Sequence, residues 1–129
     1  MINLYINQRR VGDVTVLDMK GRVRIGGGTV ALHKAIRSLA DEGKTQILLN
    51  LAGVTYIDSS GLGELVSSHV TLGNKGGELK LAHLTERLHE LLTITKLLTV
   101  FDVYDDEPKA IASFVGETLR VVQPQPFFM

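Results

Sequence analysis

The sequence predicts a small, single-domain α/β fold in which a mixed, mostly parallel sheet carries helices, in the order ββαβαβαβα. Apolar segments with strand character alternate with amphipathic helical segments, and this alternation is typical of parallel sheets with right-handed crossovers. The stretch from Gln46 to Leu51 is almost wholly apolar, as expected for a strand covered on both faces. With 129 residues, the chain has the length of one domain and can bury a substantial core.

The chain begins with two predicted strands and a helix. Residues 2–20 form strands joined by a turn near Gly12–Asp13, and the second strand is the stronger because of its β-branched residues. The glycines at 26–28 are expected to be a flexible joint, since they lack the lysine and spacing of a phosphate-binding P-loop. The helix that follows ends near Gly43 and carries an apolar stripe of Leu32, Ala35, Ile36 and Leu39.

The rest of the domain continues to alternate strand and helix. After the buried strand, a helix is predicted from about Ser60 to Leu72, and a strand from Glu78 to Ala82. A third helix begins near Thr85, which is suited to an N-cap, and a short strand follows from Thr99 to Tyr104. Pro108 then fits the first turn of a closing helix.

The domain is expected to span residues 1–118, and residues 119–129 form a tail. This tail contains Pro124, Pro126 and the aromatic pair Phe127–Phe128. A segment of this kind is expected to be loosely ordered, or to dock on a neighbouring copy in a homodimer.

The composition excludes several functional classes. Basic and acidic residues each number 14 and no strongly basic block occurs, so no direct nucleic-acid binding is expected. The sequence has no cysteine, which excludes disulfides, thiol nucleophiles and zinc–thiolate sites. No apolar run approaches the ~20 residues of a membrane span, and no secretory signal pattern opens the sequence. We therefore expect a cytoplasmic protein.

The segment from Asp58 to Gly63, Asp-Ser-Ser-Gly-Leu-Gly, carries the strongest functional signal. It lies between the buried strand and a helix, so it places hydroxyl groups at a helix N-terminus. The unpaired N–H groups and partial positive charge there favour an anion, and a hydroxyl at this point could carry a phosphate. The simpler interpretation is a capped junction, in which Asp58, Ser59 or Ser60 is the N-cap and the glycines allow tight packing.

Two predicted loops are expected to meet at one edge of the sheet. The loops at 21–28 and 52–59 both follow parallel strands, and loops at the carboxyl ends of such strands lie together. Asp58 would either orient the Ser59 hydroxyl or act as a plain N-cap. The residues that this edge would gather are Arg22, Arg24, Asp58, Ser59 and Ser60.

The Asp-Ser-Ser-Gly-Leu-Gly string resembles the signature of the anti-sigma factor antagonists, the bacterial members of the STAS family, and the order of elements over residues 3–116 is similar too. The resemblance implies a STAS-like fold in a regulatory protein that is no enzyme and needs no cofactor. It implies that Ser59 is phosphorylated by an anti-sigma factor with serine kinase activity. The unphosphorylated antagonist would capture this partner and free the sigma factor, and phosphorylation would end the capture. The residues expected at the switch and partner-binding surface are Asp58, Ser60, Gly61, Leu62, Arg22 and Arg24.

The sequence departs from the family pattern at the end of the second strand. Members commonly carry Gly-Glu-Leu-Asp there, whereas residues 21–24 of this chain are Gly-Arg-Val-Arg. The edge near Ser59 is therefore expected to be more positive than usual. Arg24 would pair with Asp58 or hold a phosphate on Ser59, because a guanidinium matches phosphate geometry.

Two other functions stay open on the sequence alone. A STAS-like domain could serve, without phosphorylation, as a scaffold subunit of a larger signalling or lipid-trafficking assembly. A serine hydrolase is disfavoured, because Asp58 to Gly61 lacks the Gly-x-Ser-x-Gly elbow.

The histidines predict no metal site. His83 and His89 are six residues apart, which is no recognised metal spacing. His69 lies on an apolar stripe and is expected to be packed and hydrogen-bonded, while His33 is expected to be solvated.

Overall fold

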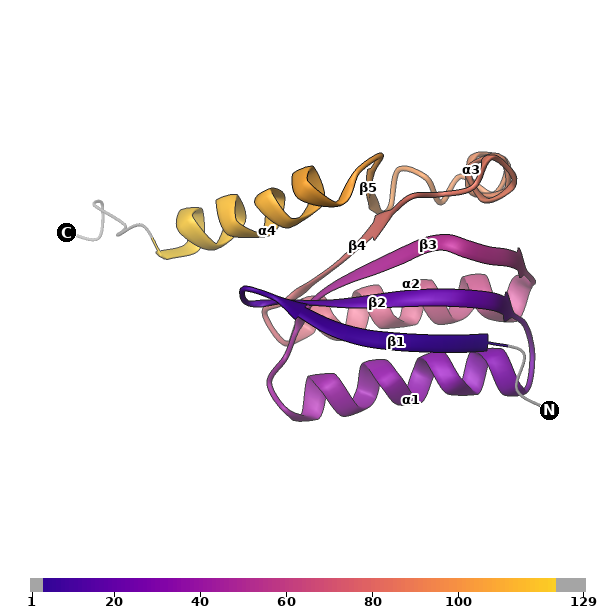
Figure 1. Cartoon of the computed structure of the whole chain (residues 1–129), viewed down its shortest axis with the longest axis horizontal. Helices are drawn as coiled ribbons and strands as arrows, with labels where there is room; N and C mark the ends of the chain where they lie inside the picture. Colours follow the sequence, from indigo (N-terminus) through magenta and orange to yellow (C-terminus); the bar gives the residue numbers. More distant parts are fainter. Residues whose placement is uncertain (1–3, 123–129) are drawn as a thin grey trace.

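The computed structural model describes residues 4–122, with side chains through residue 114, and within this range the chain forms five strands and four helices (Figure 1). Their order is the predicted ββαβαβαβα. In chain order the elements are β1 (Leu4–Val11), β2 (Val14–Val23), α1 (Gly27–Asp41), β3 (Gln46–Ile57), α2 (Ser59–Asn74), β4 (Glu78–Ala82), α3 (Glu86–Ile94), β5 (Asp102–Tyr104) and α4 (Glu107–Val122).

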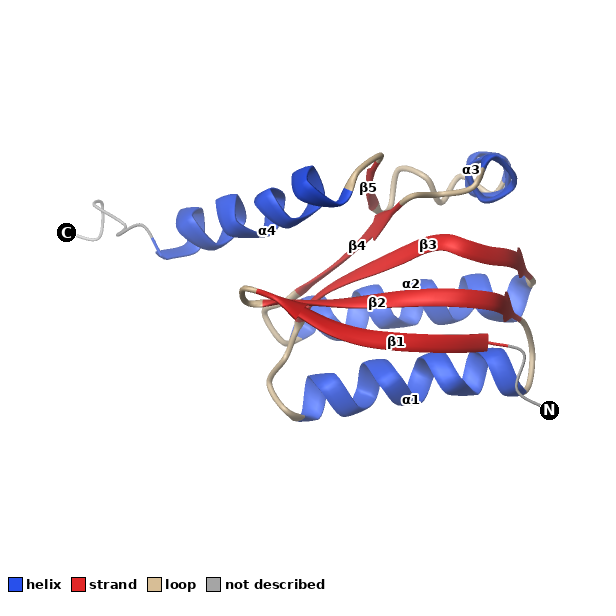
Figure 2. Ribbon diagram, viewed as in Figure 1, coloured by secondary structure: helices blue, strands red, loops and turns tan. Residues whose placement is uncertain are grey.

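The strands form one mixed sheet with the order β1-β2-β3-β4-β5. β1 and β2 make an antiparallel hairpin, and every later neighbour pair is parallel. Figure 2 shows α1 and α2 side by side along one face of the sheet, with α4 on the other side. The predicted α/β class and mostly parallel sheet are therefore confirmed.

Alternating side chains along the strands separate two cores. In β2, Leu17 and Met19 face the larger core, to which α1, α2 and α3 contribute. Val14 and Val16 of the same strand face the opposite way, into a smaller cluster closed by α4. Both faces of the central strands are thus covered, which explains their nearly continuous apolar sequence.

β2 and β3 continue into segments that were predicted to be loops. Most of segments 21–28 and 52–59 belongs to these two strands or to α1, and Arg22 lies in β2 opposite Tyr56. The two strands pair through this region, with two irregularities of register, so each satisfies the backbone groups of the other. Because this pairing joins residues far apart in sequence, the local glycine signals could not reveal it.

The glycines at 26–28 are not a flexible joint. Gly26, at a φ of 91°, makes the turn, whereas Gly27 and Gly28 open α1. A Cβ atom on Gly28 would lie 2.3 Å from the carbonyl oxygen of Arg22. The missing side chain therefore lets α1 begin directly against β2.

Two other boundaries differ from prediction. β5 is shorter than the predicted strand, because Val100 belongs to a turn in which its N–H donates to the carbonyl of Leu97 at 3.0 Å. α4 continues to Val122, past the expected domain end at residue 118. The rest of the predicted tail, 123–129, lies outside the described residues.

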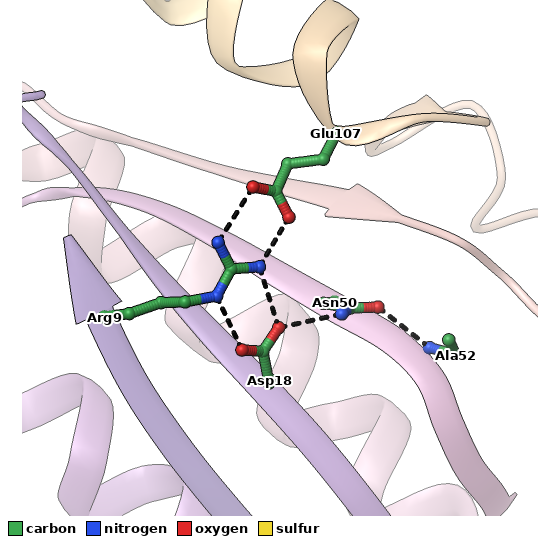
Figure 3. Close-up of polar contacts among 5 residues, drawn as sticks. All are labelled: Arg9, Asp18, Asn50, Ala52 and Glu107. Atoms are coloured by element: carbon green, nitrogen blue, oxygen red, sulfur yellow. Dashed lines mark hydrogen bonds and ion pairs between the residues drawn. The ribbon is translucent and has the colours of Figure 1, made fainter. Parts of the chain in front are cut away.

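A group of polar side chains, here called the Arg9 cluster (Arg9, Asp18, Asn50 and Glu107), fixes the start of α4 to the sheet (Figure 3). Arg9 donates to both carboxylate oxygens of Asp18, at 2.7 and 3.0 Å, and its Nη1 donates to Glu107 at 2.8 Å. Asn50 donates to Asp18 at 2.8 Å. Chiefly through these Arg9 hydrogen bonds, the pKa of Asp18 falls to about 2, and that of Glu107 is also lowered.

Lys80 lies fully buried beneath α4. Its Nζ donates to Ser113 Oγ at 2.9 Å, lies 3.5 Å from a carboxylate oxygen of Asp102, and stands 4.9 Å from the centre of the Phe114 ring. Acceptors and an aromatic face thus offset the cost of burying this charge.

Candidate switch and partner-binding site

Asp58 connects the start of α2 to the loop between β2 and α1. As the N-cap of α2, it accepts the Gly61 N–H through Oδ1 and the Ile25 N–H through Oδ2, both at 2.9 Å. These backbone donors, Ile25 first and Gly61 second, lower the pKa of Asp58. The N-cap interpretation of Asp58 is confirmed, and its second oxygen holds the loop after β2, which the sequence had placed at the same edge.

The two serines of the motif occupy different environments. Ser59 is the first residue of α2 and is exposed, and the structure shows no hydrogen bond to its hydroxyl among the described residues. Ser60 is half-buried, with its Oγ 3.3 Å from Thr29 Oγ1 at the start of α1. Thr29 in turn donates to the Arg24 carbonyl at 2.9 Å. Ser59 is thus the accessible hydroxyl, whereas Ser60 belongs to the packing between α1 and α2.

Gly61 and Leu62 contribute mainly to packing. A Cβ on Gly61 would lie 2.4 Å from the Val23 carbonyl oxygen and 2.9 Å from a methyl carbon of Ile57, so only glycine lets α2 begin this close to the strands. Leu62 is half-buried against the larger core. By contrast, no atom lies within 4 Å of a Cβ built on Gly63, whose position faces open space.

Arg22 and Arg24 line one hollow of about 470 Å³, here called the arginine hollow, together with Thr55, Tyr56 and Arg87 of α3. All three arginines of this hollow are exposed. Arg24 lies near enough to Asp58 for its charge to contribute to the lowered pKa of that carboxyl, after the larger effect of the backbone donors. The hydrogen bonds of Asp58 run to backbone groups, so Arg24 acts on it through space.

The structure therefore gathers the predicted residues at one sheet edge. Asp58 to Leu62 form the junction and first turn of α2, Arg24 lies in the adjoining loop, and Arg22 lies beside them on β2.

Sequence reasoning missed several residues at this edge. Ile25 is 73% exposed at the tip of the loop that Asp58 holds, and Thr29 links that loop to Ser60. Arg87 comes from α3, far along the chain, and no local signal could place it beside Arg22. The sequence shows an isoleucine directly before the glycines at 26–28, but its exposure depends on the tertiary position of the loop.

Two of the histidines can be compared with their predicted surroundings. No group of three metal-ligating side chains able to hold an ion occurs within the described residues. His69 packs edge-on against Phe101, with ring centres 5.3 Å apart, but its buried Nδ1 has no hydrogen-bond partner in this range, so the predicted hydrogen bond was wrong for that atom. His33 is half-exposed, as expected, and its Nδ1 lies 3.2 Å from Glu64.

Within residues 4–122, no helix combines the length and the apolar character needed to cross a bilayer.

The chain matches the model of a known family. A family model described as the STAS domain matches residues 5–110, most of the chain. The chain therefore belongs to the STAS domain family, as the Asp58–Gly63 motif indicated.

Individual known proteins have a similar sequence or a similar fold. The anti-sigma-B factor antagonist of Bacillus subtilis is 33% identical over 102 residues, which cover 79% of this chain and 90% of that protein. An anti-sigma factor antagonist from Mycobacterium paratuberculosis has a similar structure, with a TM-score of 0.73 at 20% identity, covering 86% of this chain and 93% of that one.

A second protein of similar structure is SpoIIAA of Bacillus, an anti-sigma factor antagonist. Its unphosphorylated form has a TM-score of 0.67 at 16% identity, covering 86% of this chain and 97% of that one. Its phosphorylated form also has a TM-score of 0.67, at 18% identity, covering 84% and 98%. At these identities the two SpoIIAA structures show the shared fold.

Proposed function

We propose that this protein is an anti-sigma factor antagonist whose binding to an anti-sigma factor with serine kinase activity is switched by phosphorylation of Ser59. The observation that carries the proposal is the exposed Ser59 hydroxyl at the first position of α2, beside a loop fixed by Asp58. The B. subtilis relative, by its name, antagonises an anti-sigma factor, and SpoIIAA has been described with and without phosphate.

The unphosphorylated edge suits protein binding. Ser59 is exposed, Gly63 one turn along α2 faces open space, and the Ile25 side chain projects from the neighbouring loop. Together they offer a small, hydrogen-bonding and partly apolar surface on a rigid helix end. A partner can approach α2 closely at Gly63, because no atom lies within 4 Å of the place that a Cβ would take there.

Phosphorylation changes the charge of this surface. A phosphate adds about −1.5 to −2 charges and three acceptor oxygens. Asp58 already accepts one helix N–H, from Gly61, and the Ile25 N–H of the neighbouring loop, so the new charge stands beside a carboxylate at the helix N-terminus. The phosphate is then drawn toward Arg24 and away from any acidic or apolar partner group, which releases the partner.

Phosphate mapping tests the proposal. After incubation with the anti-sigma factor kinase of the same organism and ATP, intact mass and peptide mapping should show one phosphate, on Ser59. Ser59→Ala should fold and accept none, and Ser60→Ala, as the matched control, should still accept it. Phosphate on Ser60 or Thr55 would refute the residue assignment.

Binding measurements test the switch itself. Ser59→Asp should weaken binding of the anti-sigma factor, by up to a few kcal/mol where like charges meet across the interface, and Ser59→Ala should retain it. Equal affinity of both variants, with no phosphate gained by the wild type, would favour an unphosphorylated scaffold instead.

A further inference from the structure

The arginine hollow holds positive charge that the fold itself leaves unpaired. Arg22, Arg24 and Arg87 come from β2, the loop after β2, and α3, yet they line one cavity of about 470 Å³. None of the ion pairs found within the described residues involves them. Like charges gathered this way repel one another, so their convergence favours an anionic ligand in that position.

A second hollow, of about 480 Å³, adjoins the first and is here called the apolar hollow. Tyr56 and Arg87 line both hollows and so form their common border. Its apolar lining consists of Ile57, Leu88, Leu91 and Ile94 together with the Tyr56 ring. Ile94 is 70% exposed and Tyr56 is 44% exposed, which leaves a sizeable apolar surface in contact with water.

We propose that the two hollows form one docking surface for an acidic segment of a partner protein, with carboxylates on the arginines and a large apolar side chain beside Tyr56 and Ile94. If this partner is the anti-sigma factor, the inference rests on the proposed function. A guanidinium binds a carboxylate through two parallel hydrogen bonds, which fixes the orientation of the segment.

The shape favours a polypeptide over a small molecule. Small-ligand sites bury about 70–90% of their ligand in a cleft, whereas these hollows are rimmed by exposed Tyr56 and Ile94 side chains. Adjacent charged and apolar hollows instead match consecutive side chains of one segment. Glu90 lines only the apolar hollow, so the acidic end of the segment is expected over the arginines and its apolar end over α3.

Arg24 links this surface to Ser59. It lines the arginine hollow, it lies close enough to Asp58 to affect the pKa of that carboxyl, and its loop is held by the bond from Ile25 to Asp58. A phosphate on Ser59 would compete with the carboxylates of the partner for Arg24. The docking surface and the switch are therefore expected to weaken each other.

A phage library of short random peptides, selected on the wild-type chain, tests the inference without any kinase or known partner. The selected peptides should combine aspartate or glutamate with a large apolar residue at constant spacing. By fluorescence polarisation, the triple variant Arg22→Glu, Arg24→Glu and Arg87→Glu should bind the selected peptide about tenfold or more weakly, as expected for several lost charge contacts. The affinity of the wild type should fall as salt is raised.

A control triple variant separates local from overall charge. Lys34→Glu, Arg37→Glu and Lys75→Glu change the net charge equally on exposed residues that line neither hollow, and they should leave peptide affinity unchanged. Ile94→Ser should weaken binding without altering its salt dependence. Circular dichroism and thermal melting check that every variant folds.

Several outcomes would overturn the inference. They are the selection of neutral or basic peptides, equal loss of binding in both triple variants, or binding of inorganic phosphate or ATP at the arginines with no peptide selected. Acidic peptides selected on a chain whose Ser59 is never phosphorylated would support the docking surface and contradict the switch. Phosphorylation of Ser59 without acidic peptides would do the reverse.

Discussion

The Arg9 cluster and the arginine hollow place positive charge on the same sheet in opposite surroundings. Arg9 is bound by the carboxylates of Asp18 and Glu107, and Asn50 completes the bonding of Asp18. The three arginines of the hollow line the same cavity, yet none of them takes part in an ion pair found within the described residues.

This difference separates charge that holds the fold from charge that is free to bind. Through its ion pairs and hydrogen bonds, the Arg9 cluster joins four elements, β1, β2, β3 and α4. Removing one member leaves the others uncompensated. The arginines of the hollow form no ion pair among the described residues, so their loss should weaken binding and cost little stability.

The largest expected loss of stability comes from a substitution in the core. Leu65→Ala should lower the free energy of unfolding by about 2–5 kcal/mol, because Leu65 is 1% exposed and its loss opens a cavity beneath α2. Arg24→Ala should lower it by less than about 0.5 kcal/mol. Urea unfolding of both variants measures this, and equal losses would mean that Arg24 is a structural residue.

Arg9→Ala should fall between these two variants. It leaves the Asp18 and Glu107 carboxylates facing each other, and for a part-exposed group we expect a loss of about 1–2 kcal/mol in the free energy of unfolding. Arg10→Ala, one residue along β1, removes a single hydrogen bond to Thr15 and serves as the control. The contrast between the Arg9 cluster and the arginine hollow is wrong if Arg9→Ala and Arg24→Ala lower the free energy of unfolding equally.

Low pH should weaken the Arg9 cluster, because it protonates the Asp18 carboxylate, whereas the arginines of the hollow keep their charge. The pKa of Asp18 is lowered from 3.8 to about 2, so its contribution is complete above about pH 4 and is lost as pH falls through about 2. For a side chain that is 29% exposed, this amounts to about 1–2 kcal/mol. Arg9→Ala should therefore flatten the loss of stability below pH 4, and Arg24→Ala should retain it. An NMR titration of Asp18 that shows an ordinary pKa in the wild type would contradict this.

The sequence predicted much of the fold because its signals are local. The apolar stripe of α1, the glycine that stops it and the Thr85 cap of α3 all lie where expected, since each depends on neighbouring residues. The lengths of β2 and β3 depend instead on pairing between distant segments. For the same reason Gly28 was taken for a joint, although its role is set by the approach of a carbonyl from β2.

In the candidate site, too, the sequence predicted the local features and missed those that depend on distant segments. The Asp58–Gly63 motif identified the junction, and the order of strands indicated the shared edge. Asp58 holding Ile25, and Arg87 joining the arginines, depend on the tertiary positions of a loop and of α3. No pattern within either segment could have predicted them.

The effect of Asp58→Asn is expected to be local, and it reports on the link between the loop and the switch. Asp58→Asn keeps a good N-cap with one acceptor oxygen, so the Gly61 N–H should stay protected while the Ile25 N–H loses its partner. Asp58→Ala should expose both. Amide hydrogen exchange followed by NMR distinguishes the two, with Ser59→Ala as a control that leaves both amides unchanged.

Faster exchange of Ile25 should accompany weaker binding at the arginine hollow, because the released loop carries Arg24. The two measurements on Asp58→Asn therefore test one chain of contacts, from the carboxylate through Ile25 to Arg24. If Ile25 stays protected in Asp58→Ala, the bonds from Thr29 to the Arg24 carbonyl hold the loop by themselves. Asp58 would then cap α2 without coupling the Ser59 junction to the positive charge beside it.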